Sequence, residues 1–341
     1  MAYTTINKSS DHFKALYYSG TGSENAITSV GHQPDFVWLK QANGTDHHTL
    51  YDSVRGATKY VLSNLSNAEA TNAQSLKSFD SDGFTLGTDS AVNSSSHNFI
   101  GHSWKAGTTS GLSGGTITPT SYSINATAGF GIYKWSRTGS STTDYFVHGL
   151  GVTPKIAFQK RLDGVQDWYV NHTLADGSYD YMQLNNTQAN SDDSTTAPTS
   201  SYWYPKSPET GDYITYLFAE KQGYSKFGLY KGNGSTDGAF VYTGFKPAFI
   251  MLKYSSGGGT GAWQMYNMTL NKTNKSQFFH HDANTNTQWY DNQDELDVFA
   301  NGFKARGSTV ADSNTSNGRY IFMAWAEAPL VGSNDVPCTA R

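Results

Sequence analysis

The chain has 341 residues and a formal net charge of −4, and 15% of its residues are charged, against about 25% in an average globular protein. No segment concentrates lysine and arginine, which argues against nucleic acid and an anionic membrane as partners. The 18 Phe, 8 Trp and 22 Tyr residues supply the apolar area that disordered chains lack. Composition therefore predicts a folded protein rich in the Asn, Ser and Thr residues of turns and sheet faces.

Export and membrane signals are absent from the sequence. The first residues lack the basic and apolar regions of a secretory signal, and no apolar run reaches the roughly 18 residues of a transmembrane helix. The single cysteine, Cys338, excludes an intramolecular disulfide. A composition of extracellular character without an export signal is typical of phage structural proteins, which leave their host by lysis. We therefore expect the protein in a virion.

A ten-residue block occurs three times, at residues 31–40, 151–160 and 244–253. In each copy a glycine stands three residues before a proline, and a lysine stands six residues after it. Gly-x-x-Pro predicts a turn, and the run that follows is β-branched, aromatic and apolar on both faces. Such a run is typical of a strand buried in a β-sandwich.

Each block has similar flanks. An aromatic-to-tyrosine stretch precedes it, at residues 13–17, 130–133 and 227–230, and an apolar run follows it, at residues 99–104, 213–218 and 320–325. In each closing run two aromatic residues stand five positions apart. The repeats predict an all-β protein made of three consecutive β-sandwich units of the jelly-roll or concanavalin-like kind.

Composition predicts where the units begin and end. We expect a first unit over residues 1–106, a Gly/Ser/Thr-rich linker over 107–123, a second unit over 124–222, and a third unit over 223–341 with a short C-terminal tail. One helix is predicted over residues 58–77, where Tyr60, Leu62 and Leu65 recur at loose helical spacing.

Two aromatic clusters are predicted to bind sugars, because exposed rings stack on sugar rings while amides and carboxylates hold the hydroxyl groups. The candidate residues are Tyr202, Trp203, Tyr204, Trp289, Tyr290, Asp291 and Asn292. The alternative is that these rings belong to the core, as large aromatic side chains usually do.

The sequence shows no signature of catalysis or metal binding. The histidine clusters, at residues 47–48 and 280–282, place neighbouring side chains on opposite faces of a strand, which does not favour a metal site. No Gly-x-Ser-x-Gly motif is present. The carboxylate pairs at residues 192–193 and 294–295 would form a glycosidase dyad only if folding placed them suitably. We expect no enzyme, no catalytic residues, no metal and no cofactor.

The repeated text resembles a family of repeat proteins of marine tailed phages, those of cyanobacteria (cyanophages) and of SAR11-type hosts (pelagiphages). The resemblance covers nearly the whole chain and rests on residues 50–59 (LYDSVRGATK), 78–84 (SFDSDGF), 224–228 (YSKFG), 240–247 (FVYTGFKP) and 320–327 (YIFMAWAE). It implies a virion structural protein, tail-fibre-like or concanavalin-like. The family offers no catalytic residues to transfer.

Together these observations predict a tail-associated protein of the virion surface that displays loops for attachment to host-surface glycans. A capsid decoration or cement protein with a purely structural role is the alternative, favoured by the lack of heptads and collagen-like repeats that trimerise long fibres. The expected partners are other virion proteins, further copies of the chain in a homo-oligomer (a trimer above all) and a host glycan, without nucleic acid or membrane.

Overall fold

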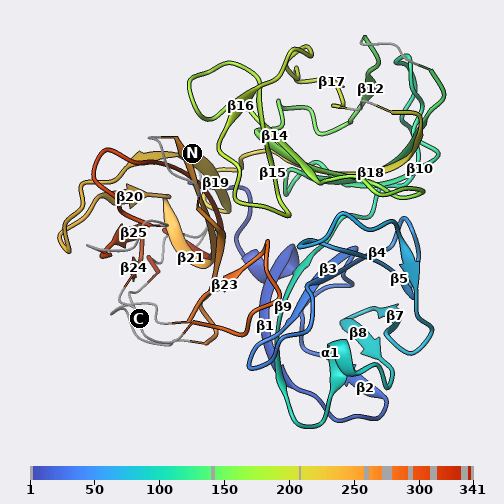
Figure 1. Ribbon diagram of the computed structural model, residues 1–341, viewed down its shortest axis with the longest axis horizontal. Helices are drawn as coiled ribbons and strands as arrows, with labels where there is room; N and C mark the ends of the chain where they lie inside the picture. The colour runs from blue at the N-terminus through green and yellow to red at the C-terminus, as the bar shows by residue number, and fades with distance from the viewer. Residues whose placement is uncertain are drawn as a thin grey trace.

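A computed structural model describes residues 3–139, 143–206, 209–256, 261–270, 279–290, 295–307, 313–331 and 337–338. Within these residues the protein is all-β, as predicted, and every pair of neighbouring strands is antiparallel. The described helical segments are η1 (Ser9–Asp11) and α1 (Ser90–Asn93), and neither is long enough to cross a membrane. The strands form three lobes around a common centre (Figure 1).

The first unit, blue to teal in Figure 1, contains a six-stranded sheet in the order β1-β9-β3-β4-β5-β6 and a three-stranded sheet in the order β2-β8-β7. Its strands are β1 (Phe13–Ser19), β2 (Asn25–Ile27), β3 (Phe36–Gln41), β4 (Thr49–Asp52), β5 (Lys59–Leu62), β6 (Ala70–Thr71), β7 (Leu76–Asp80), β8 (Gly83–Leu86) and β9 (Asn98–Trp104).

The helix predicted over residues 58–77 is wrong, because β5, β6 and the start of β7 occupy this stretch. Thr58 has a φ of 70°, in the left-handed region that a right-handed helix cannot use. Val61 is fully buried between the flanking strands β4 and β6. The helix was predicted wrongly because turns between short strands place apolar residues at a spacing that resembles that of a helix.

The second unit, green in Figure 1, contains a seven-stranded sheet in the order β10-β11-β18-β13-β14-β15-β16 and the pair β12-β17. Its strands are β10 (Ser121–Asn125), β11 (Phe130–Arg137), β12 (Phe146–Val147), β13 (Ile156–Arg161), β14 (Tyr169–His172), β15 (Asp180–Gln183), β16 (Ser191–Asp192), β17 (Tyr202–Trp203) and β18 (Gly211–Phe218).

The stretch 107–123, predicted as a linker, makes ordered contacts with the second unit. Thr108 forms a β-bridge with Ile124, Ile117 is buried, and β10 begins inside the stretch at Ser121. The domain limits at residues 106 and 222 stay predictions, since the strands group into units without marking where a domain ends.

The third unit, yellow to orange-red in Figure 1, contains a five-stranded sheet in the order β19-β26-β21-β22-β23 and a three-stranded sheet in the order β20-β25-β24. Its strands are β19 (Ser225–Lys231), β20 (Phe240–Tyr242), β21 (Phe245–Ser256), β22 (Trp263–Asn267), β23 (His281–Asp282), β24 (Leu296–Phe299), β25 (Gly302–Ala305) and β26 (Arg319–Pro329).

The repeated glycine of each block has a backbone conformation that explains its recurrence. Gly31, Gly151 and Gly244 have φ values of 94°, 70° and 81°. Residues with a Cβ atom are strained at such angles, whereas glycine is not. In the first two units the whole Gly-x-x-Pro sequence lies before β3 and β13. In the third unit only Gly244 lies before the strand, because β21 begins at Phe245, and Pro247 stands at an irregularity in the pairing of β21 with β26.

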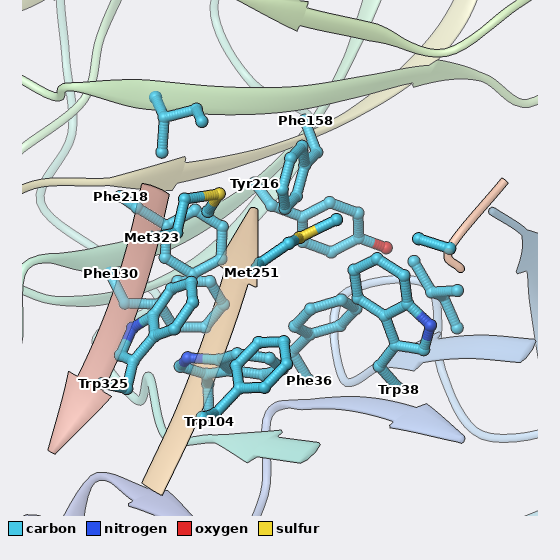
Figure 2. Packing of buried hydrophobic residues seen from close by; sticks show 14 of the residues in the cluster. Phe36, Trp38, Trp104, Phe130, Phe158, Tyr216, Phe218, Met251, Met323 and Trp325 are labelled. Carbon is cyan, nitrogen blue, oxygen red and sulfur yellow. The ribbon is translucent and has the colours of Figure 1, made fainter. Parts of the chain in front are cut away.

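The large sheet of each unit is covered on both faces. One face packs against the unit's own small sheet, and the other faces a central core that all three units share. This arrangement explains why all six residues of β3 are buried. Figure 2 shows the central core, to which the three units contribute Phe36, Trp38, Trp104, Phe130, Phe158, Tyr216, Phe218, Met251, Met323 and Trp325.

The two aromatic residues of each closing strand serve different cores. Residues five positions apart on a strand point to opposite faces. Trp104, Phe218 and Trp325, the second aromatic of β9, β18 and β26, meet at the centre with ring centroids 5.3 to 6.0 Å apart in all three pairs. The first aromatics face away from the centre; Tyr213 and Tyr320, for example, belong to the cores of the second and third units.

Hydrogen bonds link the three units in a ring. At equivalent positions beside the repeated strand, one ring nitrogen of each unit lies close to a backbone carbonyl of a neighbouring unit. The contacts are His48 Nε2 to Asp282 O (3.1 Å), Trp168 Nε1 to Leu62 O (2.8 Å) and Trp263 Nε1 to Gln183 O (2.9 Å). The first unit thus bonds to the third, the second to the first and the third to the second, so the chain has pseudo-threefold symmetry.

The lysine that ends each block is buried. Lys40, Lys160 and Lys253 are at most 1% exposed. Lys40 Nζ donates to Gln41 O (2.6 Å) and Gly44 O (2.8 Å), and Lys253 Nζ donates to Gly261 O (2.5 Å). Each ammonium group thus holds the turn that follows its strand. Burial lowers the pKa of Lys40 and of Lys160 to about 8.

We expect the protein to become more stable as the pH rises from 7.5 to 9, below the pH at which tyrosines of the unfolded chain ionise. The unfolded chain keeps the protons of Lys40 and Lys160 up to a pKa of about 10.4, whereas the native protein releases them near pH 8. The expected gain by pH 9 is about 1 kcal/mol per lysine. Urea denaturation at pH 7.5 and pH 9 measures it.

The double variant Lys40→Met and Lys160→Met is expected to lose this gain. Lys226→Met, which changes a partly exposed lysine, is the matched control and keeps it. A wild-type free energy of unfolding that stays flat or falls between the two pH values contradicts the prediction.

Candidate functional site

The first predicted aromatic cluster, residues 202–204, lies at the outer end of the second unit. Tyr202 and Trp203 form β17, which pairs with β12. Trp203 is fully buried and packs in the core of this unit, so its ring offers no face to a ligand. Tyr202 is 38% exposed and Tyr204 is half-buried.

A third tyrosine joins the two accessible ones. The ring centroid of Tyr145 lies 4.9 Å from that of Tyr202, edge-on, and 5.5 Å from that of Tyr204. We call Tyr145, Tyr202 and Tyr204 the tyrosine surface. Sequence reasoning missed Tyr145, because only the pairing of β12 with β17 brings it near residue 202. The one signal was the aromatic pair Tyr145-Phe146, which matches Tyr202-Trp203.

A series of contacts leads from the tyrosine surface, through Tyr179, to polar and charged groups. The Tyr179 hydroxyl donates to Tyr204 O (3.3 Å), and Asp193 N donates to Tyr179 O (2.8 Å). The Asp193 carboxylate accepts from Asn171 Nδ2 (2.7 Å) and lies 3.5 Å from Lys206 Nζ. The buried Asp193 carboxylate, itself held by the buried Asn171 amide, therefore fixes the ammonium group of Lys206.

Lys206 also lies over aromatic rings. Its Nζ is 3.9 Å from the ring centroid of Tyr181 and 5.7 Å from that of Tyr169. Burial, and next the neighbouring Tyr181, raises the pKa of Tyr169 to about 12, so this hydroxyl stays protonated at neutral pH. The combination of ring faces, hydroxyl groups and a cation can stack on a sugar ring and bind its hydroxyl groups.

The two described aromatic residues of the second predicted cluster pack against different neighbours. Trp289 packs on Phe279, with ring centroids 4.7 Å apart, and its backbone N donates to Ala42 O (2.8 Å) of the first unit. Tyr290 stacks on His280, with ring centroids 4.7 Å apart at 18°. Asp291 and Asn292 lie outside the described residues.

Trp289 and Phe279 line a groove of about 1010 Å³ between the first and third units. Consecutive residues of β1 form one wall, and residues of the third unit form the other. The described residues that line the groove are Ser10, Phe13, Lys14, Ala15, Leu16, Tyr17, Ala248, Thr269, Leu270, Phe279, Trp289, Ala326 and Glu327.

The histidine clusters lie at the boundary between the first and third units. His48 contacts Asp282 O across it, and His281 Nε2 lies 3.2 Å from Ala42 O. Burial holds the pKa of both imidazoles well below the usual value. Across the described parts of the chain, no three His, Cys, Asp or Glu side chains are grouped so that they could hold a metal ion.

In each carboxylate pair one described residue is buried. Asp192 is exposed on β16, while Asp193 is buried beside Lys206. Glu295 is fully buried and accepts a hydrogen bond from the Tyr266 hydroxyl. Asp294 lies outside the described residues.

Comparison with known proteins gives a family for almost the whole chain. Residues 8–329 match the family model described as Domain of unknown function (DUF7483). The chain belongs to this family. No curated protein and no solved structure matches. The DUF7483 match begins before β1 and ends at the last residue of β26, so the family model spans all three units and the core that they share.

Proposed function

We propose that this protein is a structural protein of a phage virion surface, tail-associated, and that its tyrosine surface binds host-surface glycans. The observation that carries the proposal is the contact of Tyr145, Tyr202 and Tyr204 at the outer end of the second unit, where Tyr202 is 38% exposed. The resemblance of the repeats to marine phage proteins supports the virion setting.

The binding mechanism follows from the side chains. A pyranose ring stacks its apolar face on Tyr202, and Lys206, which the buried Asp193 carboxylate holds in place, donates to a hydroxyl group of the sugar. One such site binds weakly. Presentation in a homo-oligomer, together with other virion proteins, raises the avidity by about 10²- to 10⁴-fold without new contacts.

We expect Tyr202→Ala to weaken glycan binding by about tenfold, because it removes the ring on which the sugar stacks and the apolar area that this contact buries. The measurement is binding of the oligomer to a glycan array and to host cells. Tyr242→Ala is the matched control, since Tyr242 is 53% exposed but lies on the third unit, and it is expected to bind like wild type. Absence of any glycan signal at high protein concentration contradicts the proposal.

A purely structural role in decorating or cementing the capsid is the second candidate. The closed ring of three units favours it, because a compact body has little of the length of a fibre (Figure 1). Location of the protein on the capsid in a whole-particle reconstruction, combined with a negative glycan array, would select this role. In both roles we propose no catalytic activity.

A further inference from the structure

The strands β1 and β11 occupy equivalent positions in the first two units, but in the part of the chain that the structure describes only β11 has a further strand paired with its outer edge. In the first unit β1 ends the order of its sheet, whereas in the second unit β10 lies outside the equivalent β11. β1 and β11 are equivalent because Phe13 pairs with Trp104 as Phe130 pairs with Phe218. Among the described residues no strand occupies the position beside β1 that β10 occupies beside β11.

β10 also contacts the first unit, so it fills the boundary between the first and second units. Ser123 Oγ donates to Asp35 Oδ1 (3.1 Å), and Asn125 Nδ2 donates to Lys105 O (3.2 Å). Asp35 directly precedes β3, and Lys105 directly follows β9. Asp35 and Lys105 of the first unit thus line the side of this boundary that lies across β10 from β11.

The groove between the first and third units is lined by the third unit's equivalents of Asp35 and Lys105. In the third unit, Ala248 precedes Phe249, the equivalent of Phe36, and Ala326 follows Trp325, the equivalent of Trp104. Both Ala248 and Ala326 line the groove, opposite five consecutive residues of β1. By the pseudo-threefold symmetry, the groove is therefore the counterpart of the place that β10 fills.

We propose that the groove accepts an extended segment of another protein, which pairs as an additional strand with the outer edge of β1. Lys105 N donates to His12 O (2.9 Å), so the alternation of an antiparallel pair directs the backbone of Lys14 and Leu16 to β9. The backbone groups of Phe13, Ala15 and Tyr17 face outward, where the new strand adds its hydrogen bonds.

The wall of the groove specifies the chemistry of the segment. The residue opposite Ala15 corresponds to Ser123 of β10, since Ser123 pairs with Ile132, the equivalent of Ala15. Ser123 meets the carboxylate of Asp35, whereas the new residue meets Ala248. An apolar side chain therefore fits this position better than serine. A second copy of the chain fits less well, because each of its described strands belongs to a sheet. A strand paired with β1 has the third unit on its other side, which leaves no place for the rest of such a sheet.

The test uses a synthetic peptide with the sequence of residues 119–127 that carries Ser123→Val, added to the full-length protein. We expect saturable binding and new protection of the Ala15 and Tyr17 amides from hydrogen exchange. The unchanged sequence is expected to bind about fivefold more weakly, because its serine is buried against Ala248 without a partner. N-methylation of the peptide amides that pair with β1 is expected to weaken binding at least about tenfold.

Two variants at one exposed residue separate backbone pairing from side-chain contact. Tyr17 is 43% exposed, and its outward amide lets proline replace it without loss of a bond to β9. Tyr17→Pro is expected to weaken peptide binding at least about tenfold, and Tyr17→Ala, which keeps the amide, about threefold or less. Both variants should melt within a few degrees of wild type.

Three results would overturn the proposal. The first is the absence of amide protection on β1 at millimolar concentrations of the valine peptide. The second is equal binding of the N-methylated peptide. The third is self-association of the chain that Tyr17→Pro abolishes, which would identify a second copy as the occupant of the groove.

Discussion

Trp104→Ala is expected to lower the free energy of unfolding by about 3–5 kcal/mol, the usual cost of emptying a buried tryptophan site. Trp104 is 1% exposed, and its ring centroid lies 5.3 Å from that of Trp325 and 6.0 Å from that of Phe218. The cavity therefore opens where all three units meet. Chemical denaturation gives the free energy, and hydrogen exchange shows where protection is lost.

The distribution of the loss tests whether the three units form one cooperative body. With a shared core, Trp104→Ala lowers protection in β9, β18 and β26 together. Trp135→Ala is the matched control, because Trp135 is fully buried in the second unit's own core and stacks on Tyr213 at 4.7 Å. It is expected to lose protection mainly in the second unit. If Trp104→Ala affects β9 alone, the units fold independently and the shared core contributes little.

The repeat pattern predicts the strands well but not the assembly of the units. Three copies of the Gly-x-x-Pro block identify β3, β13 and β21, and their apolar character on both faces correctly indicates burial on both sides. The sequence does not show that one of these faces serves a neighbouring unit. Hydrophobic periodicity indicates that a face of a strand is buried, but it does not indicate which element covers that face.

One clue to the shared core was present in the closing strands. Aromatic residues five positions apart on a strand face opposite sides, so Tyr320 and Trp325 could not both serve the same sandwich core. The repeated lysine was a second clue, since a buried ammonium group needs oxygen partners, and here Gln41 O and Gly44 O provide them for Lys40. Both patterns recur because each of the three units packs its large sheet between its own small sheet and the central core.

The candidate site was harder to predict than the fold. Tyr202, Trp203 and Tyr204 look alike as neighbours in sequence, yet alternation along β17 turns Trp203 into the core and leaves Tyr202 exposed. Tyr145 reaches the tyrosine surface only through a two-stranded pairing of distant residues. Short strands of two residues carry too little periodicity for a sequence to reveal such a pairing.

Acidification is expected to destabilise the protein steeply between pH 6.5 and pH 4, mostly above the pH at which carboxylates titrate. Burial lowers the pKa of His32, His172 and His280 to about 4 and that of His102 to about 3. The unfolded chain takes up these protons near pH 6.5. The native protein takes them up only near pH 4 or below, so the stability present above pH 6.5 is lost as the pH falls toward 4.

The size of the effect follows from the number of histidines. A full shift from 6.5 to 4 is equivalent to about 3 kcal/mol for each group at pH 4, and half of that is a reasonable expectation in a protein that relaxes. Four such groups together lose about 6 kcal/mol, comparable to the whole stability of a typical domain. Denaturation with urea at pH 7, 6, 5 and 4.5 should show this decline, with most of it above pH 4.5.

His102→Gln distinguishes this cause from general acid damage. His102 packs on Phe249 with ring centroids 4.0 Å apart, and its Nε2 lies 3.3 Å from Asn267 Nδ2 of the third unit. Glutamine keeps an acceptor for this contact and cannot be protonated, so the variant is expected to be less stable at pH 7 but to lose less stability on acidification. His97→Gln, at a half-buried position near the start of β9, is the matched control and should follow the wild-type profile. A wild-type profile that is flat from pH 7 to 4.5 would show that protonation of the buried histidines does not destabilise the protein.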